Sequence, residues 1–182
     1  MAKVNLALLG GFRLQTDSGE PVPLSTKKAG ALLAYLALHP GQAQPRPKLA
    51  ALLWGDRSEV QARDSLRQAL SLLRKALSHI DPRALIAHED TISFEPTALT
   101  TDAIVFEDLI AQPGTESLEK AIALYGGELL EGFPMICSTW SANALRASLR
   151  IAARFALVRE RLPFASTTTT SFGWKPCSPA GS

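Results

Sequence analysis

The side chains best suited to chemistry lie on one face of a helix predicted over residues 59–78. The opposite face carries an apolar stripe at i, i+4, i+7 and i+11: Leu66, Leu70, Leu73 and Leu77. The outward face is polar and mostly basic, with the members Arg67, Ser71, Asp64, Lys75 and Gln68, and Arg63 and Arg74 at its edge. Arginine binds guanine bidentately or holds phosphate, and glutamine pairs with adenine edges. These residue types predict a helix that reads a DNA groove.

The candidate DNA contacts divide into base contacts and phosphate contacts. We expect base or groove-floor contacts from Arg67, Gln68 and Ser71. Five basic side chains would hold phosphate: Arg46, Lys48, Arg63, Arg74 and Lys75. Two of them, Arg46 and Lys48, lie at the start of a shorter predicted helix, whose N-terminal dipole also attracts phosphate. At the tip of a predicted hairpin, His88 is a further candidate for a phosphate contact.

The first elements expected to position this face are a small sheet and a buried helix. We expect a short antiparallel sheet of three strands, over residues 4–9, 12–14 and 20–24. The last of these strands contains prolines and suits only an edge of the sheet. Ser25 or Thr26 caps the next helix, over residues 29–38. Because apolar residues surround this helix nearly all round, we expect it to be buried.

The remaining elements complete the order of a winged helix-turn-helix. Pro47 suits the first turn of a helix that runs to Trp54, although the prolines beside Arg46 favour a later start. A tight turn precedes Ser58, which caps the helix over 59–78. Two brief strands follow, and together they form a predicted hairpin over residues 84–95. In this architecture the long helix enters a DNA major groove and the hairpin is the wing.

The basic face has an ordinary alternative interpretation, the solvated side of an amphipathic helix. Two features weigh against it. Arginine and lysine outnumber Glu59 and Asp64 there, without the i,i+4 Glu–Lys lattice typical of neutral surface helices. The face also occupies the position at which a winged helix-turn-helix reads DNA.

The charge of the chain is strongly uneven along its length. The formal net charge is +6 over residues 1–83, −9 over 84–132 and +5 over 133–182, for a total of +2. A basic segment beside an acidic one predicts two modules with different partners, the first a polyanion. Since hydrophobic residues make up 46% of the 182 residues and charged residues 20%, the composition is that of a globular protein.

Several classes of protein are excluded by what the sequence lacks. The three histidines and two cysteines are dispersed, so no metal site or disulfide framework is expected. Nucleophile, phosphate-loop and dinucleotide motifs are absent, and the adjacent acidic pairs cannot face one another in a helix, so no catalysis or cofactor is expected. No run approaches 18 apolar residues and the N-terminus is no signal peptide, which predicts a cytoplasmic protein without membrane contact.

Four separated blocks resemble the Streptomyces antibiotic regulatory protein family. They are "LLGGFRL" (8–14), "KKAGALLAYLALHPGQ" (27–42), "LAALLWGDRS" (49–58) and "ARDSLRQALSLLRKAL" (62–77). The resemblance covers about residues 4–96. It implies an α+β fold that begins with an OmpR-type winged helix-turn-helix, and a transcriptional regulator that recognises direct repeats in double-stranded promoter DNA.

The resemblance continues into the acidic segment. Members of this family carry an all-helical bacterial transcriptional activation domain, similar to tetratricopeptide repeats, after the winged helix. The segments "TDAIVFEDLIA" (101–111) and "LEKAIALYGGELLEGF" (118–133) resemble its first two helices. The resemblance implies contact with the transcription machinery, with RNA polymerase as the partner. A homodimer on DNA is a further expectation.

Three segments are therefore expected: a DNA-binding domain over 1–97, the start of an activation domain over 98–133, and an atypical segment over 134–182. The last departs from the family, and we hypothesise a frameshift or early truncation there. It contains a basic amphipathic stretch over 138–162, which could cover the two acidic helices or bind membrane or nucleic acid. The tail after Pro163 has little to bury and is expected to be disordered.

A different class of function stays open. The winged domain could keep its fold but bind protein, while the acidic helices over 101–132 dock a partner as helical repeats do. A partner that stays bound at high salt, with no affinity for DNA, would favour this protein-interaction module.

Overall fold

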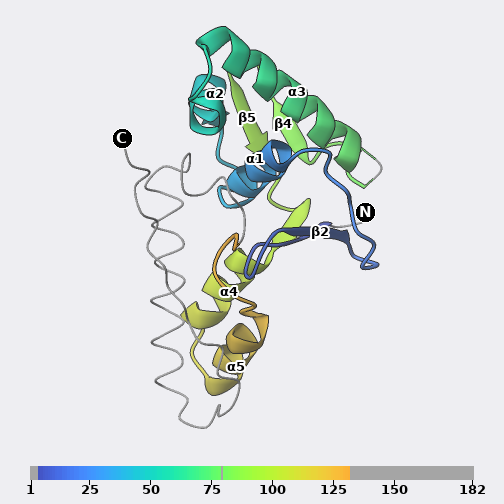
Figure 1. The fold of residues 1–182 in the computed structure, drawn as a ribbon. Coiled ribbons are helices and arrows are strands. Elements are labelled where there is room, and N and C mark those ends of the chain that lie inside the picture. Colours follow the sequence, from blue (N-terminus) through green and yellow to red (C-terminus); the bar gives the residue numbers. More distant parts are fainter. Residues whose placement is uncertain (1–3, 79, 132–182) are drawn as a thin grey trace.

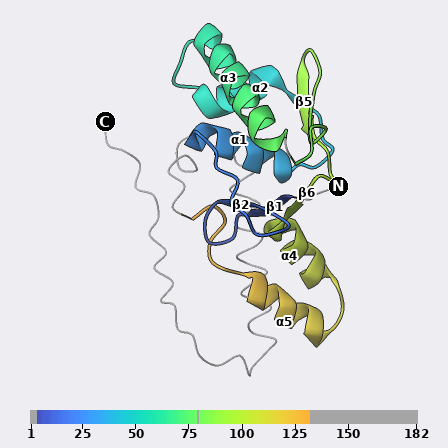
Figure 2. The same cartoon turned by 90° about the vertical axis from the view of Figure 1, so that its right-hand side faces the viewer.

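The structure is a computed structural model, which describes residues 4–78 and 80–131. Its elements in chain order are β1 (Val4–Ala7), β2 (Arg13–Thr16), α1 (Lys27–Ala37), β3 (Gln44–Pro45), α2 (Arg46–Trp54), α3 (Glu59–Leu77), β4 (Leu85–Ala87), β5 (Thr91–Phe94), β6 (Leu99–Thr101), α4 (Asp102–Ala111) and α5 (Thr115–Leu124). Figures 1 and 2 show them as successive layers. The pair α2–α3 and the β4–β5 hairpin lie at one end, followed by α1, the N-terminal sheet and finally α4–α5.

The N-terminal sheet has the strand order β2-β1-β6. The antiparallel pairing of β1 with β2 confirms the expected start of the sheet. The expected edge strand over 20–24 is reduced to an isolated antiparallel bridge of Pro21 with Gln15. Two backbone hydrogen bonds flank it, from Thr16 to Glu20 and from Val22 to Leu14. Pro21 and Pro23 have no N–H to donate to a ladder. The third strand is instead β6, which pairs with β1 in parallel and was not predicted.

Helix α1 is the buried helix that the sequence predicts. Thr26 is its N-cap, and its side chain accepts a hydrogen bond from the N–H of Ala29 at 3.1 Å. Every residue from Ala29 to Ala37 is buried. The helix packs against α2 and α3 on one side, and Figure 1 shows the N-terminal sheet on the other.

Helices α2 and α3 form the helix-turn-helix. The first starts at Arg46, with Pro45 as N-cap and Pro47 in the first turn, so the later start expected from the two prolines is wrong. The second has a capping box, in which Ser58 and Gln61 satisfy each other's backbone N–H groups. It ends at Leu77, one residue before the predicted end, and its apolar stripe is buried as predicted.

The wing is the antiparallel hairpin of β4 and β5. A two-residue strand, β3, extends it to a second three-stranded sheet of order β3-β5-β4 and was not predicted. The N–H of Arg46 donates to the carbonyl of Asp90 at 2.9 Å, so the start of α2 is tied to the tip of the wing.

Helices α4 and α5 follow β6 and pack against each other. Helix α4 confirms the predicted helix over 101–111, but α5 starts earlier than expected and ends at Leu124 instead of 133. Two glycines follow it closely, and Leu129 forms a bridge with Leu9 beside β1. The expected basic stretch over 138–162 and the tail after it lie outside the described residues.

Candidate nucleic-acid interface

Helix α3 presents the predicted polar face to solvent. Its six candidate residues are all exposed: Arg63, Arg67, Gln68, Ser71, Arg74 and Lys75. On the opposite side Leu66 and Leu70 are each 2% exposed, and Leu73 is fully buried. The core packing of the leucines therefore fixes the rotation of α3 about its axis. In Figures 1 and 2 no other labelled element covers the outer side of this helix.

Two of the arginines on α3 are paired with carboxylates of the same helix. Arg63 Nη2 bonds to Glu59 Oε1 one turn earlier. Arg67 Nη1 lies 3.1 Å from Asp64 Oδ1. The expectation of a basic face without a pairing lattice is therefore wrong for these two arginines. Exposed pairs of this kind are weak, so both guanidinium groups can exchange partners at small cost.

Arg74 and Lys75 differ from those arginines because neither has a carboxylate within ion-pair distance among the described residues. Both are exposed and lie in the last turn of α3, where a positive charge interacts favourably with the helix dipole. Their charges are therefore the most available on this face for a polyanion.

Arg46, Lys48 and His88 lie where α2 meets the wing. Arg46 donates from Nε and Nη2 to the carbonyl of His88, at 3.2 and 3.0 Å. Lys48 Nζ donates to the buried Gln44 Oε1 at 3.1 Å and lies 5.8 Å from the centre of the Tyr35 ring. The first turn of α2 has no acidic residue and no side-chain cap, which leaves its positive dipole end uncompensated.

Sequence reasoning missed two features of this surface. Arg57, in the turn between α2 and α3, donates from Nη1 to Ser65 Oγ at 2.9 Å and adds a basic group near the start of α3. Val60 is 70% exposed, the one large hydrophobic side chain so exposed among residues 4–78 and 80–131. Arg57 directly precedes the N-cap Ser58, and this position in the sequence could have identified it as part of the basic surface. Helical periodicity alone does not predict the exposure of Val60.

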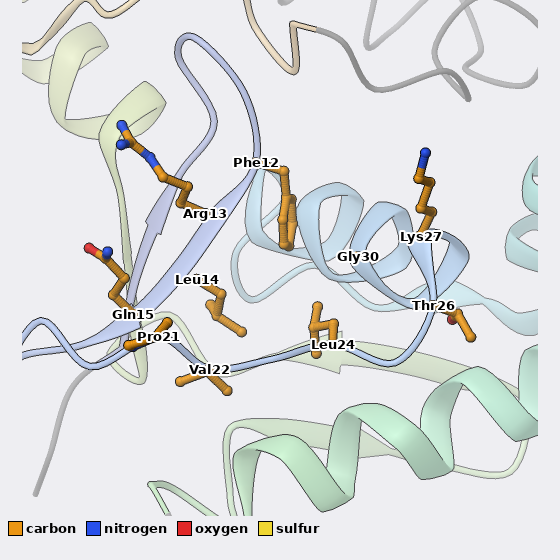
Figure 3. Close-up of a pocket in the computed structure, with 10 residues that line it drawn as sticks. All are labelled: Phe12, Arg13, Leu14, Gln15, Pro21, Val22, Leu24, Thr26, Lys27 and Gly30. Carbon is orange, nitrogen blue, oxygen red and sulfur yellow. The ribbon is translucent and has the colours of Figure 1, made fainter.

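An open groove of about 360 Å³ lies elsewhere, between β2, the segment over 21–24 and the start of α1 (Figure 3). Its floor is apolar, with Phe12, Leu14, Val22 and Leu24 among the lining residues. Figure 3 shows Arg13 and Lys27 extending from it in different directions. Its lining, among the described residues, includes the hydroxyl of Thr26 and the amine of Lys27, but no carboxylate, imidazole or thiol that could pair with them for acid–base or nucleophilic chemistry.

The groups with shifted pKa values also lie away from α3. Burial raises the pKa of Asp102, and burial together with Glu128 and Glu131 raises the pKa of Tyr125. Within the part of the chain that the structure describes, no three His, Cys, Asp or Glu side chains gather as metal ligands. No helix there is long and apolar enough to cross a membrane.

Comparison with known proteins supports the assignment of the fold. Residues 19–91 match the family described as "Transcriptional regulatory protein, C terminal". Over 87 residues the chain is 34% identical to the transcriptional regulatory protein EmbR of Mycobacterium bovis and of Mycobacterium tuberculosis. This alignment covers 47% of the chain and 22% of each relative, so the chain spans well under half of their length.

A solved structure agrees with the fold. The Mycobacterium tuberculosis EmbR in complex with a low-affinity phosphopeptide superimposes with a TM-score of 0.57 and 24% sequence identity, over 88% of this chain and 43% of that chain. At this identity the likeness concerns the fold alone. The helix-turn-helix, the wing and the family match together place a winged-helix domain in this chain, which over residues 19–91 is similar to the family of C-terminal domains of transcriptional regulatory proteins.

Proposed function

We propose that this chain is a transcriptional regulator that binds double-stranded DNA sequence-specifically. In this proposal α3 enters the major groove and the β4–β5 hairpin acts as the wing. The observation that carries it is the exposed face of α3, where basic and amide side chains lie opposite a fully buried leucine stripe. The family match over residues 19–91 supports the same role.

The candidate residues divide according to their present partners. Arg74 and Lys75 have no carboxylate partner among the described residues, so we assign them to phosphate. Arg67, Gln68 and Ser71 are exposed on the same face and carry side chains that can pair with base edges, so we assign these three to the bases. Arg63 and Lys48 are further phosphate candidates, as are Arg46 and His88 at the wing.

Binding to DNA is tested by fluorescence anisotropy with the full chain. A duplex selected from a random library and a shuffled duplex of the same composition are titrated at about 50 and 200 mM salt. Several phosphate contacts should cost orders of magnitude in affinity over this range, with a slope near −0.9 per contact. Arg67→Ala should lose about 1–3 kcal/mol on the selected duplex, whereas Arg74→Ala should weaken both duplexes alike.

Lys120→Ala is the matched control for these variants. Lys120 is an exposed cation paired with Glu116 on α5, in the layer farthest from α3. Its loss should leave both affinities unchanged. If the folded chain binds neither duplex, the proposal fails and the protein-interaction module becomes the better description.

The proposal extends to the acidic helices. Helices α4 and α5 would begin an activation segment that contacts RNA polymerase, and two copies of the chain would bind adjacent repeats of promoter DNA in the cytoplasm. The acidic residues of this segment support an interaction with a basic partner surface. Sedimentation of the chain with and without a two-repeat duplex tests the dimer, and copurification with RNA polymerase tests the contact.

A further inference from the structure

We infer that Asp64 is a specificity-determining residue of α3, which positions the Arg67 guanidinium and weakens binding to DNA of arbitrary sequence. This inference rests on the proposed function. It concerns an acidic residue within a surface that otherwise attracts phosphate.

The geometry places the two side chains side by side on the outward face. Arg67 Nη1 and Asp64 Oδ1 are 3.1 Å apart across one turn of α3, and Arg67 donates the hydrogen bond. The Asp64 side chain is 56% exposed and that of Arg67 is 77% exposed. Because neither contributes to the core, the pair adds little to the stability of the fold. Its effect is on the surface that α3 offers to a partner.

The pairing leaves most of the guanidinium available. Arginine has five N–H donors in a rigid fork, and the hydrogen bond to Asp64 uses Nη1 alone. Recognition of guanine needs two donors aimed at O6 and N7. A guanidinium held by Asp64 on one side loses rotamer freedom before it meets the base, so less entropy is lost when the complex forms.

The charge of Asp64 acts differently in the two kinds of complex. When α3 only follows the phosphate backbone, a carboxylate at its outward face is repelled and also withdraws Arg67 from phosphate. When α3 lies in the groove, the carboxylate faces base edges, where it accepts hydrogen bonds from the cytosine amino group. Asp64 should therefore weaken binding to arbitrary DNA more than it weakens binding to the correct site.

Glu59 provides a matched control on the same helix. It pairs with Arg63 one turn earlier, so Glu59→Gln removes the same charge from the same element as Asp64→Asn does. The Glu59–Arg63 pair involves the edge of the candidate face, whereas Arg67 belongs to the proposed base contacts. A general change in helix charge would appear in both variants, and a specific role only in Asp64→Asn.

The test measures both variants, in the full chain, on the selected and the shuffled duplex at about 50, 100 and 200 mM salt. Asp64→Asn should tighten binding to the shuffled duplex and make its salt slope steeper by about 0.9, since Arg67 becomes free for phosphate. The ratio of the affinity for the selected duplex to the affinity for the shuffled duplex should fall roughly tenfold. A change of this size corresponds to the loss of discrimination at one base pair. In the Arg67→Ala background, Asp64→Asn should change the ratio much less.

Three results would overturn the inference while the proposed function stands: an unchanged affinity ratio in Asp64→Asn, the same loss of ratio in Glu59→Gln, or a full effect of Asp64→Asn without Arg67. If the unchanged chain binds neither duplex, the proposed function itself fails and the inference fails with it. Circular dichroism and thermal unfolding confirm that each variant keeps its fold.

Discussion

The carboxylate of Asp102 accepts hydrogen bonds from the backbone N–H of Leu8, with distances of 2.8 and 2.9 Å to its two oxygens. It also accepts from the N–H of Leu9 at 3.0 Å and of Ala103 at 2.8 Å. Asp102 is the first residue of α4, and Leu8 directly follows β1. One side chain thus joins the acidic helices to the sheet of the winged domain, and the parallel pairing of β6 with β1 reinforces the junction.

We expect Asp102→Ala to lower the free energy of unfolding by about 1–3 kcal/mol, because partly buried N–H groups lose their acceptor. Urea denaturation of the full chain measures the change. Asp108→Ala, which removes an exposed carboxylate from the same helix, is the control and should stay within about 0.5 kcal/mol. Equal losses in the two variants would show that the junction does not depend on Asp102.

Asp102 should also give the stability a distinctive dependence on pH. Burial raises the pKa of this carboxyl above its ordinary value of 3.8, against the opposing effect of the hydrogen bonds from Leu9, Leu8 and Ala103. The folded state then binds the proton more tightly than the unfolded state does. The contribution of Asp102 is therefore most favourable below pH 3.8 and is lost as the pH rises through the raised pKa.

Asp102→Asn removes this titration. Between pH 3.8 and the raised pKa, the unfolding free energy of the unchanged protein should fall relative to that of the variant. Denaturation at a series of pH values between about 3.5 and 6.5 gives the difference in unfolding free energy between the two proteins. The contributions of the other carboxyl groups cancel in this difference. Two parallel curves would contradict the raised pKa. A constant offset is expected in any case, since the amide cannot accept all of the hydrogen bonds.

Gly10 makes a second junction between the winged domain and the end of the described chain. Its φ is +84°, and a Cβ added there would lie 2.6 Å from the carbonyl oxygen of Gly126. Gly10→Ala should cost about 1–2 kcal/mol for the left-handed backbone, plus about 1–3 kcal/mol for the steric overlap. Gly19 has a φ of +82° and open space around it, so Gly19→Ala should show the backbone cost alone. Thermal unfolding of the two variants separates these effects, and equal losses would rule out the contact with Gly126.

Helical periodicity made the central part of this fold predictable from the sequence. The leucine stripe of α3 and the caps at Thr26 and Ser58 are local features, and each element they predict is present within one or two residues. The strand β3 is only two residues long and shows no alternating pattern. The strand β6 was missed although β4, which has the same length, was predicted as part of a local hairpin. What makes β6 a strand is its parallel pairing with β1, more than 90 residues away in the chain, and no local pattern encodes such a partner.

The candidate site likewise has features that the local sequence predicts and features that it does not. Exposure of Arg67, Gln68 and Ser71 follows from burial of the leucines on the other face, so the sequence could predict it. The carboxylate partners of Arg63 and Arg67 lie at i,i+4 and i,i+3 spacing on the same helix, so the sequence could have indicated both pairs. The contact of Arg46 with His88 depends on how α2 meets the wing, and spacing along the chain does not specify such a tertiary contact.

The bond from Arg46 to the wing gives a last prediction. Because its Nε and Nη2 both donate to the carbonyl of His88, Arg46→Ala should loosen the hairpin tip even without DNA. The N–H of His88 donates to the carbonyl of Thr91 at 2.9 Å and reports on this opening. A loss of about 1 kcal/mol in local stability corresponds to roughly fivefold faster amide exchange at His88.

Hydrogen exchange of the full chain, resolved at single amides, checks this prediction. Amides in the middle of α1 should exchange as in the unchanged protein, since the backbone bond from Arg46 to Asp90 and the pairing of β3 with β5 remain. Arg83→Ala, which removes an exposed basic side chain near the other end of the hairpin, is the control. If exchange at His88 is unchanged in Arg46→Ala, the guanidinium does not hold the wing and is left free for phosphate. A salt slope that falls by about 0.9 in that variant would then assign it there.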